Sequence, residues 1–338
     1  MSTTSASTRE DDRTVAAAYD GLICDLDGVV YRGARALPFA IEALQSMRVV
    51  YATNNASRSA AVVAAALAEL GLADPLVVTS ADAGASLLAS RLGPGAMVLA
   101  VGGEGVADAL ARNGLTPTRD RRDRPTAVLQ GWGRAVTVDD LAAAAIVVAE
   151  GGLWCATNTD RTLPTEAGIV PGNGTLIAAV ETAAGRAPDL VAGKPSAPLY
   201  RAAAERFDPP AARLLAVGDR LDTDIAGAAS AGLDSMWVLG GVDRLVDLAR
   251  SSLVPTYTAR DLRALHAAYP TTRRDQHSWQ ADTDQIVVQG TEVRHLGDGP
   301  AVAALAAQVV LDLRDELDRG QVVEVAEALD EVIAASGQ

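Results

Sequence analysis

A short apolar run over residues 21–24 ends directly in two aspartates, Asp25 and Asp27, which are followed at once by Gly28. The apolar run predicts a buried strand, and the two carboxylates would then lie at its end. Charge is costly to bury and like charges repel, so a pair of this kind needs a compensating partner. The pair is therefore a candidate for chemistry.

Two further aspartates, Asp219 and Asp224, occur in the segment GDRLDTDI, a turn that follows an apolar run and opens a predicted helix. Three or four carboxylates that converge on one point are tolerated only when a cation offsets their charge. Ligands that are all oxygen atoms select a hard cation. The sequence therefore predicts a Mg²⁺ site.

Other predicted strand ends supply complementary groups: Thr53 and Asn54 are neutral donors, and Lys194 is a cation. Donors, an ammonium group and Mg²⁺ arranged around a carboxylate suit a phosphoryl group, because its developing charge must be stabilised from several sides. The set favours phosphoryl chemistry.

The elements that must position these residues alternate along the chain. From residue 21 onward, short apolar runs are followed by turns and alanine-rich helical stretches, which predicts parallel strands in a doubly wound α/β fold. Strands near residues 23, 49, 190, 215 and 236 end in the polar or glycine-containing segments DLD, TNN, GK, GD and GG. Ligands bind beyond the carboxyl ends of such strands. We expect one catalytic sheet built from these strands, with a second α/β lobe inserted between them.

Four segments in order, DLDGVVY, TNNASRS, GKP and GDRLDTDI, resemble the four motifs of the haloacid dehalogenase (HAD) superfamily of phosphatases. The insertion between the second and third motifs resembles the class that carries an α/β cap at that place. Within the insertion, the passage from CATNTD to DLVAGKPS is similar to the IIA subgroup, which includes p-nitrophenyl-phosphatase-like, phosphoglycolate and glycerol-phosphate phosphatases. The resemblance covers about residues 20–265.

The resemblance implies a doubly wound, Rossmann-like HAD core with an inserted α/β cap and a small C-terminal α+β appendage. The expected parts are a disordered arm over 1–17, a catalytic core over 18–80 plus 189–268, a specificity-determining cap over 81–188, and a linker with a small appended domain over 269–338. In the last part, residues 270–285 are polar and predict a linker, followed by one strand and two amphipathic helices.

The resemblance also implies a role for each candidate residue. Asp25 would be the nucleophile that forms an aspartyl-phosphate, and Asp27 would protonate the leaving alkoxide and then deprotonate the attacking water. Mg²⁺ would be held by the Asp25 carboxylate, the Asp27 backbone carbonyl and Asp219, with Asp224 directly behind these ligands. The groups that would bind the phosphoryl oxygens are Thr53, Lys194 and the backbone around Gly28 and Asn54.

Substrate choice is expected to depend on the cap. Its loop TNTDRTLPTEAG carries Thr162, Leu163 and Pro164, small or apolar side chains that favour a small polyol or hydroxy-acid phosphate. We expect glycerol 3-phosphate as the substrate, with 2-phosphoglycolate or another small phosphomonoester as the alternative. Haloacid dehalogenation is disfavoured by Asp27, since cleavage of a carbon–halogen bond needs no acid at that position. A regulatory or scaffold protein that acts through its C-terminal tail is the non-enzyme alternative.

Composition narrows the class of protein. The formal net charge of -14 argues against nonspecific nucleic-acid binding, which needs many basic residues. The two cysteines, Cys24 and Cys155, lie in apolar runs and fit buried thiols in a reducing compartment. The polar N-terminal segment has no signal-peptide pattern, and no apolar stretch is long enough for a membrane span. We therefore expect a cytoplasmic protein, and capped proteins of this type often pair through their caps, which leaves a homodimer open.

Overall fold

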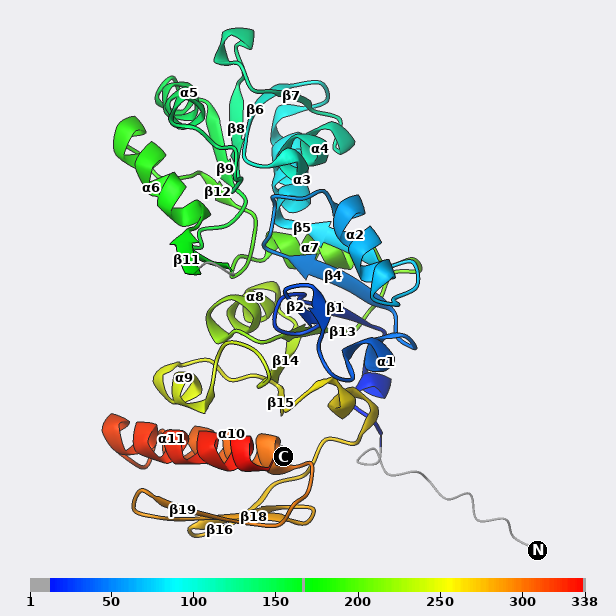
Figure 1. The fold of residues 1–338 in the computed structure, drawn as a ribbon, viewed down its shortest axis with the longest axis vertical. Helices are drawn as coiled ribbons and strands as arrows, with labels where there is room; N and C mark the ends of the chain where they lie inside the picture. The colour runs from blue at the N-terminus through cyan, green and yellow to red at the C-terminus, as the bar shows by residue number, and fades with distance from the viewer. Residues whose placement is uncertain (1–12, 166–167, 337–338) are drawn as a thin grey trace, which may run out of the picture. The chain divides into compact units, whose positions relative to one another are not determined.

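The computed structural model describes residues 13–165 and 168–336. The chain divides into two compact units (Figure 1). The first runs to Arg48 and also contains Ala212–Ile225 and the chain from Leu233, and the second contains Val49–Ala211 and Ala226–Gly232. Residues 1–12 of the expected N-terminal arm lie outside the described residues. Val15 is buried and its amide donates to the Ala267 carbonyl, so the chain is ordered before residue 17, where the arm was expected to end.

The first unit contains four parallel strands in the order β15, β14, β13 and β1. Strand β1 (Gly21–Cys24) pairs in register with β13 (Leu214–Gly218), and every residue of both strands is buried. Continuous apolar runs of this kind are typical of parallel strands that are covered on both faces. The carboxyl ends of β1 and β13 therefore lie side by side, and Asp25 and Asp219 leave them.

The C-terminal part of the first unit is a small α+β module, as the sequence predicts. Its helices α10 and α11 cover one face of a four-stranded antiparallel sheet, β16–β19 (Figure 1). The prediction of a linker over 270–285 is wrong, because this segment forms β16 and β17. In β17, Trp279 and Ala281 are buried and alternate with the exposed Gln280, so the strand is polar on its solvent face.

This module shares one hydrophobic core with the strands and helices before it. Leu221, Ile225 and Trp237 pack in the same buried cluster as Trp279 and Leu305. A core that continues from one segment into the other makes the module part of the first unit rather than a separately folded body.

The helices and strands of the first unit are β1, β2 (Tyr31–Arg32), β3 (Arg35–Ala36), α1 (Ala40–Leu44), β13, β14 (Asp234–Val238), α9 (Leu245–Arg250), β15 (Tyr257–Ala259), β16 (Arg273–Asp275), β17 (Ser278–Ala281), β18 (Asp284–Gln289), β19 (Glu292–Leu296), α10 (Val302–Leu313) and α11 (Arg319–Ala335). Shorter helical turns occur over Ala16–Ala18 and Leu262–His266, and a π-helix covers Leu221–Ile225.

The second unit contains a five-stranded parallel sheet in the order β12, β9, β8, β6 and β7. Helices α5 and α6 lie side by side against one face of this sheet, and α3 and α4 lie on the other (Figure 1). This is the inserted α/β lobe that the sequence predicts. Strands β4 and β5 of the same unit pair with each other in parallel.

One expected strand belongs to a different sheet. The segment near residue 190 was predicted in the catalytic sheet, but β12 (Leu190–Val191) pairs with Cys155 and Ala156 of β9 in the five-stranded sheet. A strand of two residues has too little pattern to specify its neighbour, so the position of Lys194 just after it was the only guide.

The elements of the second unit are β4 (Val49–Thr53), α2 (Ala60–Glu69), β5 (Leu76–Thr79), α3 (Ser80–Leu92), β6 (Met97–Val101), α4 (Glu104–Arg112), β7 (Thr116–Thr118), β8 (Ala127–Gln130), α5 (Val138–Ala149), β9 (Leu153–Ala156), β10 (Thr162–Thr165), β11 (Gly168–Pro171), α6 (Asn173–Ala184), β12, α7 (Pro198–Ala204) and α8 (Ala226–Ala231). A short 3₁₀ turn covers Arg121–Asp123.

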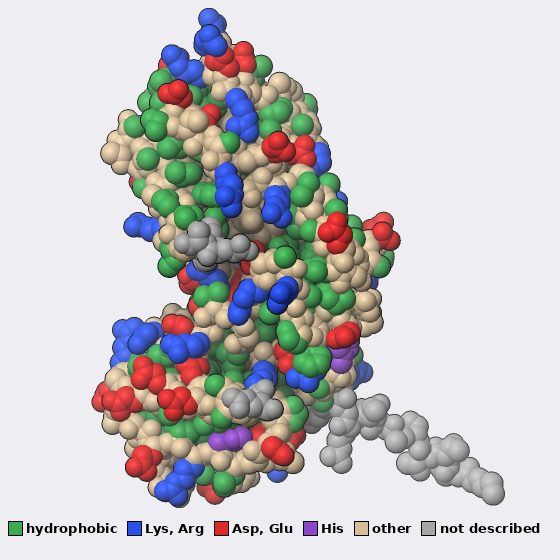
Figure 2. Space-filling model, viewed as in Figure 1, with side chains coloured by type: hydrophobic (Ala, Val, Ile, Leu, Met, Phe, Trp, Pro, Cys, Tyr) green, Lys and Arg blue, Asp and Glu red, His purple; other side chains and the backbone are tan. Residues whose placement is uncertain are grey.

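The surface carries both signs of charge. On the face shown in Figure 2, acidic and basic side chains are interspersed among hydrophobic and other atoms. Within the described residues, no helix combines the length and the apolar character that crossing a membrane requires. Cys24 and Cys155 are both buried and outside any disulfide, as the apolar runs around them predict.

Candidate active site

The first two candidate residues leave the end of β1. The Asp25 amide donates to the Val217 carbonyl at 2.9 Å, so the ladder between β1 and β13 extends to this aspartate. Asp25 is half-buried and Asp27 is exposed, whereas Leu26 between them is fully buried. The buried leucine fixes the backbone on which both carboxylates stand, and the two acids meet different environments.

Asp219 follows β13 and is buried, with 1% of its surface exposed. The backbone amide of Val242 donates to its Oδ2 at 2.8 Å, and the indole Nε1 of Trp237 donates to its carbonyl at 3.1 Å. An amide donor stabilises the ionised form of a buried carboxylate. Asp219 is therefore held in one position by one residue of β14 and one residue that follows it.

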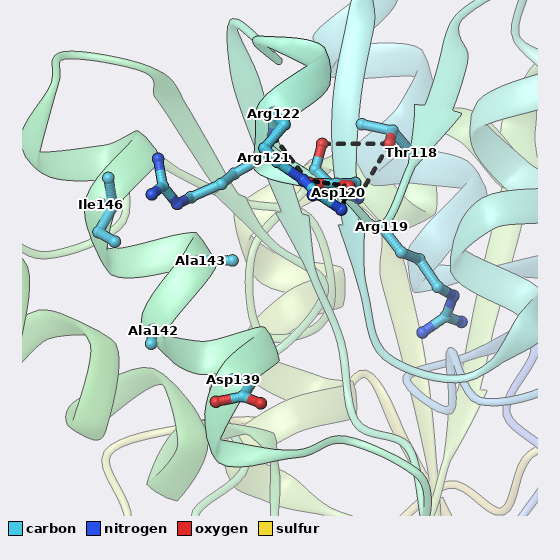
Figure 3. A pocket seen from close by; sticks show the side chains of 9 residues that line it. All are labelled: Thr118, Arg119, Asp120, Arg121, Arg122, Asp139, Ala142, Ala143 and Ile146. Carbon is cyan, nitrogen blue, oxygen red and sulfur yellow. Dashed lines mark hydrogen bonds and ion pairs between the residues drawn. The ribbon is translucent and has the colours of Figure 1, made fainter.

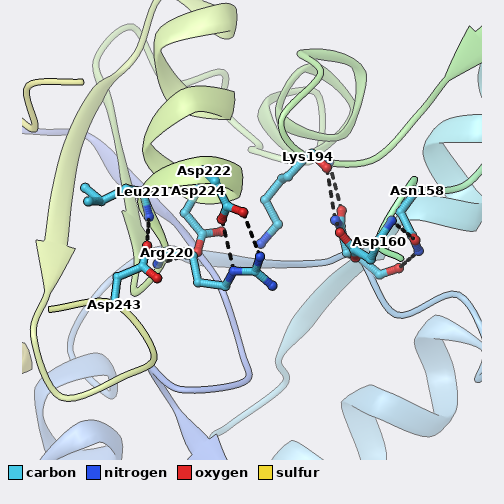
Figure 4. A network of polar contacts seen from close by, with 9 residues as sticks. Asn158, Asp160, Lys194, Arg220, Leu221, Asp222, Asp224 and Asp243 are labelled. Atoms are coloured by element: carbon cyan, nitrogen blue, oxygen red, sulfur yellow. Dashed lines mark hydrogen bonds and ion pairs between the residues drawn. The ribbon is translucent and has the colours of Figure 1, made fainter. Parts of the chain in front are cut away.

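Asp224 lies in the π-helix, an irregular turn that is often found at functional sites. It is 2% exposed, and its Oδ2 accepts from the Arg220 amide at 3.1 Å. Arg220 itself pairs with Asp222 at 2.9 Å (Figure 4). The π-helix thus directs Asp224 inward while Asp222 and Arg220 pair outside.

Asp25, Asp219 and Asp224 each offer one carboxylate oxygen, and these three atoms lie within 4.8 Å of one another. Three ionised oxygens at such distances repel strongly in a partly buried place, and a hard divalent cation would offset this repulsion. The donor set is all oxygen, as magnesium and calcium prefer. The residues present therefore fit a cation of this class.

Two glycines make room for the Asp219 carboxylate. A Cβ at Gly28 would lie 2.2 Å from Asp219 Oδ2, and one at Gly241 would lie 2.0 Å from the same oxygen. Gly28 also has a φ of 87°, in the left-handed region that favours glycine. Glycine at both positions lets two backbone segments close around the carboxylate.

The second unit brings together Thr53, Asn54 and Lys194. The Lys194 amide donates to Asn54 Oδ1 at 2.8 Å, and Asn54 Nδ2 donates to the Lys194 carbonyl at 3.0 Å. Lys194 is 3% exposed, and its ammonium donates to the Ala52 carbonyl at 3.2 Å. Thr53 Oγ1 accepts from the Asn55 amide at 3.1 Å. The end of β4 and the segment after β12 therefore form one polar cluster, part of which Figure 4 shows.

The expected cap loop is an antiparallel hairpin, in which β10 pairs with β11. Thr162 is exposed and Leu163 is half-buried, whereas the side chain of Pro164 lies outside the described residues. The residues just before the hairpin are tied to the polar cluster, because Asn54 Nδ2 also donates to Asp160 Oδ2 at 3.3 Å and Asn158 Nδ2 donates to the Asn54 carbonyl at 2.8 Å. The base of the hairpin is thus anchored beside Asn54.

A separate hollow of about 570 Å³ lies on the outer surface of the inserted lobe (Figure 3). Its lining includes Arg119, Asp120, Arg121 and Arg122 from the charged loop and Ile146 from α5. The Arg122 guanidinium beside Asp120 lowers the pKa of that carboxyl to about 2. These residues differ from those predicted to do chemistry, and the loop is mostly solvated, as its composition predicts.

The sequence interpretation missed the residues that support the predicted ones. Val242 and Trp237 hold Asp219, and Asp243 Oδ2 accepts from the Leu221 amide at 2.6 Å at the start of the π-helix (Figure 4). Burial raises the pKa of Asp243, partly offset by this hydrogen bond. The glycine pair at the end of β14 was the available signal for this loop, because strand-end glycines admit close backbone approach.

Comparisons with known proteins agree with this geometry. A family model described as haloacid dehalogenase-like hydrolase matches residues 22–116, and one described as HAD-hydrolase-like matches residues 191–265. A D-glycerol 3-phosphate phosphatase of Mycobacterium tuberculosis is 43% identical over 320 residues, which cover 89% of this chain and 88% of that protein. This chain belongs to the haloacid dehalogenase-like hydrolases.

Solved structures of the same hydrolase family are similar in fold. The crystal structure of a glycerol phosphate phosphatase from Mycobacterium tuberculosis in complex with magnesium has a TM-score of 0.76 and 41% identity, covering 94% of this chain and 92% of that one. A 4-nitrophenylphosphatase from Thermotoga maritima has a TM-score of 0.68 and 31% identity, but it covers only 75% of this chain while 98% of its own length is matched. The family resemblance and the α/β fold inferred from the sequence are thereby confirmed.

Proposed function

We propose that this hydrolase is a Mg²⁺-dependent phosphatase that cleaves glycerol 3-phosphate to glycerol and phosphate. The observation that carries the proposal is the convergence of three carboxylate oxygens within 4.8 Å at the ends of β1 and β13. A relative that is 43% identical and is named D-glycerol 3-phosphate phosphatase supports the choice of substrate.

The metal site follows from the donor set. Asp25, Asp219 and Asp224 would supply carboxylate oxygens, and the Asp27 carbonyl remains a further predicted ligand. Bound there, Mg²⁺ supplies positive charge that offsets the carboxylates and the anionic phosphoryl group. Support comes from the relative whose crystal structure contains magnesium.

Asp25 acts as the nucleophile. Its carboxylate oxygen forms a bond to phosphorus while the bond between phosphorus and the glycerol oxygen breaks, which leaves an aspartyl-phosphate. The departing alkoxide needs a proton, and Asp27 is proposed to donate it. The exposed side chain of Asp27 fits this role, since an acid that serves substrate and water in turn must remain accessible.

The second half of the reaction regenerates the enzyme. Asp27, now ionised, removes a proton from a water molecule whose oxygen attacks phosphorus, and the bond between phosphorus and Asp25 breaks. Inorganic phosphate leaves, Asp25 is a carboxylate again, and Asp27 has regained its proton. One water is consumed for each ester hydrolysed, so atoms and charge balance.

Thr53, Asn54, Lys194 and the backbone at Gly28 are proposed to bind the phosphoryl oxygens. The hydrogen bonds that hold Asn54 and Lys194 to each other leave little freedom in their backbones. Donors fixed before the substrate arrives stabilise developing charge without reorganisation. The fixed positions of these donors support their proposed role in binding the phosphoryl oxygens.

The inserted lobe, residues 81–188, is proposed as the cap that selects the substrate, with residues 18–80 plus 189–268 as the catalytic core and residues 269–338 as the appended part. The hairpin with Thr162, Leu163 and Pro164 would contact the alcohol part of the ester. Its base is hydrogen-bonded beside Asn54, which supports a position near the phosphoryl group. Small side chains there suit a glycerol moiety better than a ring.

Assembly and compartment are further proposals. A homodimer through the cap is supported by the exposed apolar side chains Val138 and Ile146 on α5, which are 81% and 38% exposed. Sedimentation velocity of the wild type would test it, and a monomer at micromolar concentration would exclude it. The cytoplasm is supported by two buried cysteines that form no disulfide with each other. Nucleic acid and membrane are not expected as partners.

Release of inorganic phosphate from a panel of esters tests the activity. With Mg²⁺ present, we expect glycerol 3-phosphate to have a higher kcat/KM than 2-phosphoglycolate, UMP and pyridoxal phosphate, and we expect chelation of Mg²⁺ to abolish turnover. The Asp25→Asn variant should be inactive on every ester. A tenfold preference for phosphoglycolate or a nucleotide would overturn the substrate proposal. An inactive wild type would overturn the proposal that the protein is a phosphatase.

A further inference from the structure

The C-terminal helices of the first unit hold both ends of α9. At its N-terminus, the carboxylate of Asp330 on α11 accepts from the Leu245 amide at 2.9 Å and from the Val246 amide at 3.3 Å. These amides are among the four that a helix N-terminus cannot satisfy internally. A carboxylate at this position also interacts favourably with the helix dipole.

Basic side chains bind backbone carbonyls at the C-terminus of the same helix. Arg314, which follows α10, donates to the carbonyl of Leu248 and to the carbonyl of Leu253, the latter at 3.1 Å. Arg319 of α11 donates to the Arg250 carbonyl at 3.3 Å. Arginine at a helix C-terminus satisfies its last carbonyls and complements the dipole. Opposite charges thus clamp the two ends of a six-residue helix that is too short to be stable alone.

The residues just before α9 reach the metal-binding carboxylates. In the segment 242–246, the Val242 amide donates to Asp219 Oδ2 and the Asp243 carboxylate accepts from the first amide of the π-helix that carries Asp224. The next contacts of the same segment are those of Leu245 and Val246 with Asp330. Five consecutive residues therefore connect α11 with the segment that holds Asp219 and Asp224.

Packing reinforces this connection. Leu221 and Ile225 of the π-helix lie in one buried cluster with Leu245 of α9 and with Val325 and Leu329 of α11. Close-packed side chains transmit displacements because few voids are available to absorb them. A displacement caused by a change at Asp330 would therefore extend to α9 and the 242–246 segment, because the packing around Asp330 cannot absorb it.

We propose that Asp330 is a positioning residue for the metal site, which it reaches through the N-terminus of α9 and the 242–246 segment. Arg314 has the same role at the other end of α9. The C-terminal module is then a structural part of the catalytic centre. The inference rests on the proposed function only in placing Mg²⁺ at Asp25, Asp219 and Asp224.

The test is the affinity of the full-length protein for Mg²⁺, measured by calorimetry without substrate. We expect Asp330→Ala to weaken Mg²⁺ binding by roughly three- to tenfold, less than the loss that groups hydrogen-bonded directly to a metal ligand produce. Asp330→Asn, which retains one acceptor oxygen, should lie between the wild type and Asp330→Ala. Arg314→Gln should weaken binding as well. Glu331→Ala is the matched control, since Glu331 is the next residue of α11 and is exposed.

Kinetics separate positioning from a general loss of folded protein. For Asp330→Ala, the Mg²⁺ concentration that gives half-maximal phosphatase activity should rise, and saturating Mg²⁺ should restore most of kcat. Equal Mg²⁺ affinity in Asp330→Ala, Glu331→Ala and the wild type would overturn the proposal, as would a lowered kcat that excess Mg²⁺ leaves unchanged. A wild type that binds no Mg²⁺ would instead contradict the proposed metal site.

Discussion

Asn54 and Lys194 hold each other through two hydrogen bonds, one in each direction, between the side-chain amide of Asn54 and the backbone of Lys194. The distances are 2.8 Å to Asn54 Oδ1 and 3.0 Å from Asn54 Nδ2. This reciprocal pair joins the end of β4 to the segment after β12, which are 140 residues apart in the sequence. Two groups proposed to bind phosphate are thereby fixed relative to each other.

Loss of this pair should impair catalysis. In Asn54→Ala both hydrogen bonds are lost, and each is worth about 1 kcal/mol, so we expect kcat/KM for glycerol 3-phosphate to fall by roughly tenfold to a hundredfold. Steady-state phosphate release measures it. Asn113→Ala is the control, because Asn113 makes its side-chain hydrogen bond to Ala109 at the end of α4. Similar kinetics for the two variants would show that the Asn54 contacts do not serve catalysis.

Two adjacent glycines give a sharp comparison at the proposed metal site. A Cβ at Gly241 would lie 2.0 Å from Asp219 Oδ2, whereas a Cβ at Gly240 would meet only the Arg260 carbonyl at 3.5 Å, an ordinary contact. We expect Gly241→Ala to displace Asp219 and to weaken Mg²⁺ binding at least about tenfold. Gly240→Ala should bind Mg²⁺ like the wild type. The idea fails if calorimetry finds both variants equally affected.

The buried thiols should be chemically silent in the native state. Burial raises the pKa of Cys155 to about 12, so at pH 8 only about one thiol in ten thousand is ionised. Cys24 is also buried. We expect neither cysteine to react with a chromogenic disulfide reagent until denaturant is added, when two thiols per chain should react. Rapid reaction of the native protein would show that Cys24 or Cys155 is accessible to solvent.

The free energy of unfolding should depend on pH through Asp330, whose ionised form is disfavoured by burial in the folded state. Burial raises the pKa of Asp330, with the hydrogen bonds from Leu245 and Val246 acting in the opposite direction. The folded state therefore keeps this proton at a pH where the unfolded chain has released it. The stabilisation that the raised Asp330 pKa gives the folded state is fully present below the ordinary aspartate pKa. It is lost as pH rises through the raised pKa of the folded state.

Comparison with Asp330→Asn isolates this contribution, because the amide does not titrate. As pH rises above about 4, the ordinary aspartate pKa, the free energy of unfolding of the wild type should decline relative to that of Asp330→Asn. Urea denaturation at several pH values measures the difference. A difference that stays constant, or that changes in favour of the wild type as pH rises, would contradict the assignment.

Much of the candidate site could be predicted from the sequence, because the motifs that form it are short local segments. DLDG follows an apolar run, and GDRLDTDI follows another, so the meeting of Asp25, Asp219 and Asp224 follows from the rule that parallel strands end at one edge. The inserted lobe and the fold class were predicted for the same reason, since alternation of strands and helices is visible along the chain.

The rest depends on contacts between distant segments. The support of Asp219 by Val242 and the capping of α9 by Asp330 link residues that share no local pattern. The polar segment 270–285 was mistaken for a linker because β17 buries only alternate side chains, although the order Ser278, Trp279, Gln280, Ala281 carries that two-residue period. The two-residue strand β12 offered no pattern at all.

The aspartyl-phosphate on Asp25 is the central claim, and Asp27→Asn with p-nitrophenyl phosphate tests it most directly. The p-nitrophenolate leaves without needing a proton, so the first step should proceed in this variant, while the second step lacks its base and should be slow. We predict a burst of one p-nitrophenolate per active site, together with phosphate bound to the Asp25 peptide by mass spectrometry and lost on treatment with hydroxylamine. The account is contradicted if release is linear from the start and Asp25 carries no phosphate in acid-quenched samples.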